Sequence, residues 1–138
     1  MSLELYFLPY DQGQPASFPR AELRTVFPLV EAESEPDYWC IRYDANHECA
    51  IGVTPVVGRP ELVASFCVYR PCAEPRFWND LLTVLRLGPV AMVFPGAAPP
   101  IVGSAATIAH LPADVIASMG PPMVADTGAA IASAVAMA

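Results

Sequence analysis

A stretch without formal charge most constrains how this chain can fold. From Leu87 to Ala113 there is no Asp, Glu, Lys or Arg, and a stretch of this length could span a membrane if it formed one helix. Prolines and glycines interrupt it at Gly88, Pro89, Pro95, Gly96, Pro99, Pro100, Gly103 and Pro112. Because proline ends or kinks a helix, the stretch predicts several short elements in a protein core and no membrane span.

Length and composition predict one ordered domain over residues 1–138. The chain is of the usual size for a single domain. Hydrophobic residues make up 54% of it and charged residues 15%, whereas disordered chains are poor in apolar residues and rich in charge. A chain this apolar leaves part of its apolar surface exposed, and a partner or a second copy of the chain can cover that surface.

The charge balance narrows the class of partner. Fourteen acidic residues stand against seven arginines, and the formal net charge is −7. Nucleic acids and anionic membranes both require a clustered basic face, so we expect neither as a partner. An acidic protein of this kind favours a basic protein partner.

The expected compartment is the cytoplasm. The segment from Met1 to Pro9 contains Glu4 and no basic residue, so it does not match a secretory signal. In a reducing compartment the four cysteines, Cys40, Cys49, Cys67 and Cys72, are expected to be reduced thiols buried as small apolar groups.

The first half of the chain predicts strands around one helix. Apolar runs predict strands at 3–8, 38–43, 48–53 and 61–69, and the last three of these form an antiparallel meander over 38–69. Ser17 is expected to cap a short helix with Pro19 in its first turn. Residues 31–37 read as an acidic linker. If Tyr43 pairs with Glu48, Cys40 lies opposite Ile51 and shares a face with Cys49.

The second half predicts short helices and strands in alternation. Pro75 opens an amphipathic helix that ends before Gly88, and a buried strand follows at 90–94. Short strands are expected at 100–103 and 122–125, on either side of a helix at 112–119. Asp126 or Thr127 should cap a terminal alanine-rich helix. The fold class is therefore α+β, with a mixed, mainly antiparallel sheet and helices mainly on one face.

The sequence contains no recognisable catalytic, metal or cofactor motif. His47 and His110 stand apart, and the neighbours of His47 on a strand would point to opposite faces. A Gly-x-Ser-x-Gly elbow and a glycine-rich phosphate loop are both absent. We therefore expect a protein that is not an enzyme and needs no cofactor.

Acidic and aromatic residues gather around the predicted hairpin, and together they form the candidate partner-binding surface. Exposed Trp and Tyr residues supply much of the binding energy at protein interfaces, and acidic residues steer a basic partner. The candidate residues are Glu33, Glu35, Asp37, Tyr38, Trp39, Tyr43, Asp44 and Glu48.

Four segments carry a resemblance to a known family, namely Leu5–Pro9, Arg76–Leu82, Val90–Gly96 and Leu111–Pro121. Their layout resembles that of small bacterial immunity proteins encoded beside polymorphic or secreted toxins. The resemblance implies a non-enzymatic cytosolic protein that neutralises a cognate toxin by occluding its active site. It carries over no site residue.

Two other functions are compatible with the sequence. The first is a small-molecule-binding or catalytic domain with a pocket between the sheet and the helix at 75–87. The second is a structural subunit of a larger assembly. Between Leu87 and Ala138 the charged residues are Asp114 and Asp126, and the terminal helix is apolar nearly all round. We therefore also expect a homodimer through this helix, with Ile131 and Val135 in the interface.

Overall fold

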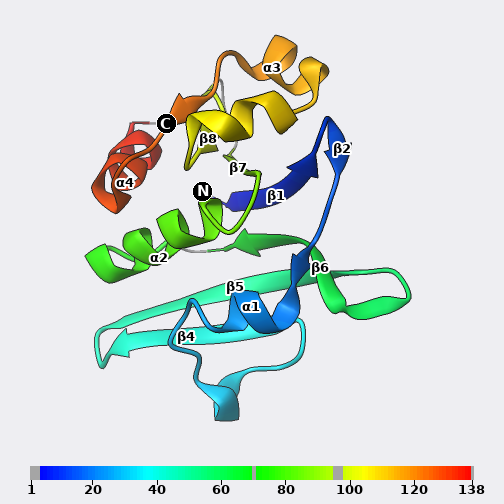
Figure 1. Ribbon diagram of the computed structural model, residues 1–138. Coiled ribbons are helices and arrows are strands. Elements are labelled where there is room, and N and C mark those ends of the chain that lie inside the picture. The colour runs from blue at the N-terminus through cyan, green and yellow to red at the C-terminus, as the bar shows by residue number, and fades with distance from the viewer. Residues whose placement is uncertain (1–3, 70, 95–97, 138) are drawn as a thin grey trace.

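The strand predicted at 3–8 lies in the middle of the sheet (Figure 1). A computed structural model describes residues 4–69, 71–94 and 98–137, and in it strand β1 (Leu5–Asp11) pairs antiparallel with β6 (Arg59–Val68) and with β7 (Val90–Val93). Leu3 lies outside the described residues. The central position explains the nearly continuous apolar run of this strand.

The predicted meander is confirmed. Strands β4 (Tyr38–Asp44), β5 (His47–Val56) and β6 pair in chain order, and each pairing is antiparallel. In the described residues the sheet has the order β4-β5-β6-β1-β7-β8-β9, and the pairing of β8 with β9 is its one parallel pairing. The sheet is therefore mixed and mainly antiparallel, as the sequence predicts.

Four short strands complete the sheet. They are β2 (Gln14–Pro15), β3 (Phe18–Pro19), β8 (Ile101–Val102) and β9 (Met123–Val124). β8 and β9 lie where the sequence predicts short strands, whereas β2 and β3 lie in segments predicted as loop and helix start. A tight turn with positive φ at Gln12 and Gly13 folds β2 back onto β1.

The helices are short and lie on both faces of the sheet. They are α1 (Arg20–Arg24), α2 (Pro75–Leu85), α3 (Ala113–Met119) and α4 (Gly128–Ala136), with 3-10 turns η1 (Glu31–Glu33) and η2 (Ala105–His110). In the described part of the chain, the longest helix falls short of what a membrane crossing requires, and none is apolar over such a length.

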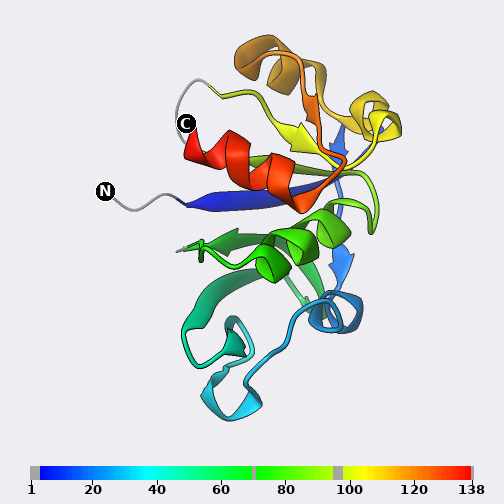
Figure 2. The same cartoon turned by 90° about the vertical axis from the view of Figure 1, so that its left-hand side faces the viewer.

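One face of the sheet, here called the core face, carries most of the hydrophobic core. Its side chains pack with α1, α2 and α4, and in Figure 2 α2 and α4 lie in front of the strands. The largest fully buried members on the strands are Leu5, Phe7, Trp39, Ile41, Ile51, Phe66, Met92 and Ile101. Over β7 and β8 the opposite face is covered by η2 and α3, which pack on Ala91 and Val102. The helices are thus mainly, but not wholly, on one face.

Several predicted helix ends are confirmed and one is wrong. Thr127 caps α4 by accepting a hydrogen bond from the backbone N–H of Ala130 (3.1 Å), and Gly120 ends α3 with φ of 93°. Ser17 does not cap α1, because α1 begins at Arg20 after Pro19 and has no side-chain cap. α1 is short because β3 pairs with β6 just before it and Pro28 follows shortly after it.

The predicted register of the β4–β5 hairpin is wrong by one residue. Glu48 lies opposite Arg42, and Trp39 lies opposite Ile51. An irregularity in the pairing between Arg42 and Asp44 takes up the extra residue Tyr43. Since a shift of one residue exchanges the two faces, Cys40 points away from the core, whereas the side chain of Cys49 is buried.

The segment 28–37, which includes the predicted acidic linker at 31–37, runs along the outer edge of β4, and we call it the strap. Its backbone hydrogen bonds run from Val30 N to Cys40 O (2.9 Å), from Arg42 N to Pro28 O (3.1 Å) and from Glu35 N to Tyr38 O (2.7 Å). The hydroxyl of Ser34 accepts from Cys40 N (3.0 Å) and donates to Val30 O (2.8 Å). The strap therefore occupies an edge that would otherwise attract another strand.

The strap predicts a stability effect at Ser34. Ser34→Ala leaves the half-buried N–H of Cys40 without its acceptor, which should lower the free energy of unfolding by about 1 to 2 kcal/mol. The control is Ser118→Ala, because the exposed hydroxyl of Ser118 bonds only within its own helix, and its effect should stay within about 0.5 kcal/mol. Urea unfolding followed by circular dichroism measures both. Equal effects of the two substitutions would show that the strap is not held by Ser34.

Candidate protein-binding surface

The candidate residues from the sequence do not form one surface. Glu33, Glu35 and Asp37 lie on the strap, and Tyr38 and Glu48 lie beside them on the meander. Tyr43 and Asp44 belong to a polar cluster against α2. Trp39 is completely buried, so its side chain offers a partner no surface.

The buried side chain of Trp39 helps to hold the strap in place. Its indole N–H donates to the backbone carbonyl of Pro36 (3.0 Å), and the guanidinium of Arg24 lies 5.6 Å from the ring centre. Arg20 also holds the strap, since its Nε donates to Pro60 O (2.7 Å) and its Nη2 pairs with Asp37 (3.2 Å). The strap is thus held by the side chains of Trp39 on β4 and Arg20 on α1, as well as by its backbone hydrogen bonds to the edge of β4.

Arginines neutralise part of the acidic tract. Arg24 pairs with Glu31, and Arg42 lies between Glu33 (2.7 Å) and Glu48 (2.7 Å from Nε). Among the ion pairs of the described residues, none involves Glu35. The tract therefore keeps a negative surplus, although a smaller one than its sequence suggests.

A row of tyrosines crosses the face of the sheet opposite the core. Tyr38 lies opposite Gly52, Gly52 lies opposite Cys67, and Cys67 lies opposite Tyr6. Residues opposite one another share a face, so these side chains form one line over β4, β5, β6 and β1. Tyr6 is 38% exposed and Tyr38 46%.

Tyr69 completes this row. It lies two residues beyond Cys67, its N–H donates to Ala50 O (3.4 Å), and its ring is 41% exposed. Its ring stacks with that of Tyr38 at a centroid distance of 6.3 Å. We call Tyr6, Tyr38, Cys67 and Tyr69 the tyrosine face.

Gly52 makes room for the ring of Tyr69. A Cβ atom added to Gly52 would meet Cε2 of that ring at 2.7 Å, which is closer than van der Waals contact permits. Since Gly52 has no side chain, the ring of Tyr69 can lie down over the strand and meet Tyr38. The two rings are therefore held in place before any partner arrives.

The side chains of the tyrosine face are uncharged, and carboxylates lie beside it at Tyr6 and at the edge of β4. The hydroxyl of Tyr6 bonds the carboxylate of Glu4, and this bond and partial burial raise the pKa of Tyr6 to about 12. Burial raises the pKa of the Cys67 thiol. Both groups are therefore neutral at pH 7. Among the described residues, Glu4 bonds Tyr6, Glu35 bonds Tyr38 through the backbone, and Glu33, Glu48 and Arg42 meet at Cys40, two residues beyond Tyr38.

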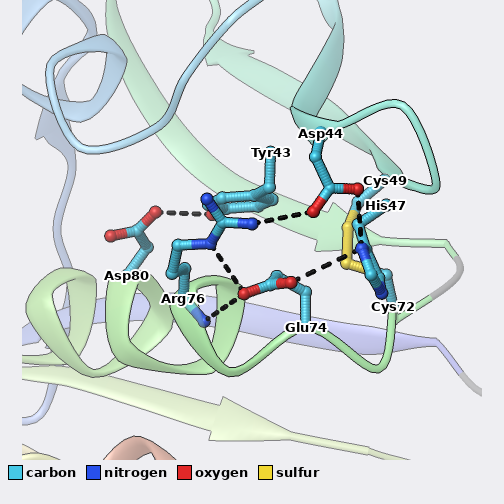
Figure 3. The surroundings of a disulfide bond; sticks show 8 residues. All are labelled: Tyr43, Asp44, His47, Cys49, Cys72, Glu74, Arg76 and Asp80. Carbon is cyan, nitrogen blue, oxygen red and sulfur yellow. Dashed lines mark hydrogen bonds and ion pairs between the residues drawn. A yellow bond between two sulfur atoms is a disulfide. The ribbon is translucent and has the colours of Figure 1, made fainter.

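On the core side of the sheet, a polar cluster joins the β4–β5 turn to the start of α2 (Figure 3). Arg76 bridges Asp44 (2.9 Å) and Glu74 (2.7 Å). His47 Nδ1 lies 2.8 Å from Asp44 and 3.5 Å from the second oxygen of Glu74. Glu74 also caps α2 by accepting from the N–H of Arg76 (3.1 Å). His47 is thus part of a network of charged and hydrogen-bonding side chains.

Tyr43 extends this cluster along α2. Its hydroxyl bonds the carboxylate of Asp80, and Arg76 lies 5.5 Å from the centre of its ring. Burial, followed by the bond to Asp80, raises the pKa of Tyr43, and burial raises the pKa of Asp80. Tyr43 therefore serves to fasten the hairpin to α2, and its predicted role in partner contact stays a prediction.

The cluster predicts a pH effect. The bond from Arg76 lowers the pKa of Glu74, and bonds from Asn46 and His47 lower that of Asp44, from ordinary values of 4.5 and 3.8. A folded-state pKa below the unfolded one stabilises above the unfolded pKa, and this contribution is lost as the pH falls through the folded pKa. Arg76→Met should therefore lose less stability than the wild type between about pH 5 and pH 3.

Arg86→Met is the matched control for this effect. Arg86 donates a hydrogen bond to the backbone carbonyl of Gly103, and this carbonyl does not titrate. The free energy of unfolding of Arg86→Met should fall with decreasing pH as steeply as that of the wild type, even if the variant is less stable at pH 7. Urea unfolding at a series of pH values gives the slopes, and parallel curves for wild type and Arg76→Met would exclude this role of the cluster.

A disulfide joins Cys49 of β5 to Cys72, which precedes α2 (Figure 3). The prediction that all four cysteines are reduced is therefore wrong for this pair, while Cys40 and Cys67 are free thiols. Spacing along the chain did not reveal the pair, because 23 residues separate the two cysteines and only the folded sheet brings them together.

The disulfide predicts a thiol count. Denatured without reductant, the chain should titrate two thiols, and after reduction four. Cys72→Ser should titrate three without reductant, because Cys49 then has no partner. Reduction should lower the free energy of unfolding by about 2 to 4 kcal/mol, as expected when a cross-link of this span is opened. Four thiols in the unreduced wild type would contradict the pairing.

The alternative function, a small-molecule-binding or catalytic domain, would place its pocket at the sheet-facing side of α2. Phe77, Leu81, Val84 and Leu85 fill this side and are completely buried, so side chains occupy the place where the sequence suggested a pocket. A groove of about 660 Å³ lies instead beside α1, where Arg20, Arg24 and the strap line it. His110 ends η2, and its Nδ1 accepts a hydrogen bond from the backbone N–H of Gln12 (3.1 Å).

Tyr6, Tyr69 and Cys67 were missed by the sequence reasoning. The alternation in 61–69 does place Cys67 and Tyr69 on one face, but it does not say which face stays uncovered. Comparison with known proteins gives no further guide, since no family model, no curated protein and no solved structure matches this chain.

Proposed function

We propose that this chain is a binding protein that recognises a basic protein partner through the tyrosine face. The observation that supports the proposal best is the row of exposed tyrosines on an open sheet face of a chain with net charge −7. Tyrosine is among the residues that dominate binding energy at interfaces, because it combines a large apolar ring with a polar hydroxyl.

The arrangement of this face favours binding. Tyr38 and Tyr69 stack on each other over Gly52, so they lose little side-chain freedom when a partner packs on them. The carboxylates beside the face are exposed and remain near water, where they would speed the approach of a basic partner rather than add much affinity. Tyrosines thus supply affinity in this proposal, and carboxylates supply rate and selectivity.

The kind of partner follows from the resemblance to immunity proteins. In this proposal the chain acts without catalysis and neutralises a basic toxin by covering its active site with the tyrosine face and the adjoining strap. The expected cytoplasmic location belongs to the same proposal. In that location the Cys49–Cys72 disulfide has to persist where thiols are ordinarily kept reduced, so the thiol count above also tests the proposed compartment.

Site-specific cross-linking tests the binding surface. A photoreactive amino acid placed at residue 69 should cross-link a basic protein in cells of the source organism. The same amino acid at Val57, which is 98% exposed in the β5–β6 turn, should not. The captured protein is then purified and used in binding measurements with the full chain.

With that purified protein, Tyr38→Ala and Tyr69→Ala should each weaken affinity at least about tenfold, mainly through faster dissociation. Glu35→Lys should instead slow association and reduce its dependence on salt, with thermal stability nearly unchanged. Val57→Ala is the control and should change neither rate. Equal cross-linking at residues 57 and 69, or unaltered affinity of both tyrosine variants, would overturn the proposal.

A further inference from the structure

A second apolar surface lies on the other side of the molecule, between α2 and α4. A groove of about 640 Å³ runs between these helices, and Trp78, which is almost fully buried, is part of its lining. The lining residues are Ala73, Pro75, Trp78, Asn79, Thr127, Ala129, Ala132 and Ser133. None of these side chains carries a charge.

The outer side of α4 has small side chains. Ala129, Ser133 and Ala136 are exposed and follow one another at intervals of three or four residues, so they lie on one side of the helix. Helices with small residues at a contact can approach one another closely. The outer side of α4 can therefore pack closely against another helix.

A second hollow of about 270 Å³ lies on the far side of α4. Its lining is also uncharged and includes Phe94, Ile101, Met123 and Met137, and the side chain of Met137 is 88% exposed. Apolar hollows thus flank α4 on both sides, and an exposed methionine stands at its end.

Charge indicates which occupant suits this surface. A basic partner would be drawn to the acidic strap, whereas two copies of this chain, each with a net charge of −7, repel one another except where acids are missing. None of the side chains that line the two hollows beside α4 is charged, and the nearest charged residues along the chain are Arg76 and Asp80 on α2 and Asp126 before α4. The uncharged surface around α4 is therefore the part of the molecule best suited to meet a second copy.

The geometry points to a two-fold dimer in which the outer side of α4 of each copy lies in the α2–α4 groove of the other. One wall of the groove is α4 itself, so the surface can serve both copies at once, as a two-fold contact requires. The inference goes beyond the proposed function. Because α4 packs over the core face, the dimer would leave both tyrosine faces open and bind two partners.

The interface residues differ from those predicted from the sequence. Ile131 is completely buried and Val135 nearly so, and both belong to the hydrophobic core of their own chain. Substituting them with glutamate would unfold the monomer and would not test the dimer. The residues that can be changed without loss of the fold are the exposed Ala129 and Ser133.

Sedimentation equilibrium of the full chain, without any partner, tests the dimer. The wild type at micromolar concentration should show twice the monomer mass of 14.7 kDa. Ala129→Glu combined with Ser133→Glu should give the monomer mass with an unchanged circular dichroism spectrum. Ala117→Glu and Ser118→Glu together, also at exposed helical positions, form the matched control and should leave the dimer intact.

Salt supplies a second readout. Since the proposed contact is uncharged and the copies repel, raising sodium chloride from 0.05 to about 0.5 M should leave the dimer intact or tighten it. A wild type that keeps the monomer mass at high micromolar concentration would overturn the inference. A dimer that survives the double substitution on α4, or that salt dissociates, would do so as well. Neither result touches the proposal for the tyrosine face, because no partner is present.

Discussion

The pairing of β1 with β6 on one side and β7 on the other is the contact on which the rest of the structure depends. β6 ends the meander, and β7 follows α2, so β1 unites the two halves of the chain. Phe7 stacks on Phe66 with ring centres 4.4 Å apart, and both rings are buried. Because these contacts join residues far apart in sequence, the sheet can close only when both halves are present.

The same sheet explains why the two candidate surfaces lie on opposite sides. α2 seals the core face, and α4 lies against α2, where a Cβ on Gly128 would meet the backbone nitrogen of Asn79 at 2.6 Å. In the part of the chain that the structure describes, η2 and α3 cover the opposite face at β7 and β8, and the tyrosines remain exposed on the neighbouring strands. An acidic, aromatic surface and an uncharged, small-residue surface are thus separated by the thickness of the sheet.

Local patterns predicted the elements better than their relations. The alternation from Tyr38 to Tyr43 correctly placed Trp39 and Ile41 on one face, and the proline at 75 and the threonine at 127 correctly marked helix starts. The predicted hairpin register was wrong because the pairing is irregular between Arg42 and Asp44, where Tyr43 bonds Asp80 of α2, and the alternation of residues carries no sign of such a distant contact. Of the predicted surface, Tyr38, Glu35 and Glu48 lie at or beside the tyrosine face, whereas Trp39 is buried.

The sequence by itself determined the α+β class, the meander, the position of the long helix and the acidic balance of the surface. These properties follow from periodicity, from proline and glycine, and from counts of charge, all of which act locally or by sum. Only the tertiary structure decided that the acidic tract straps the edge of β4, that Cys49 meets Cys72, and that Tyr6, Tyr38 and Tyr69 share an uncovered face. Each of these depends on which distant segments lie side by side, and a side chain's exposure is set by the neighbours that the fold brings to it.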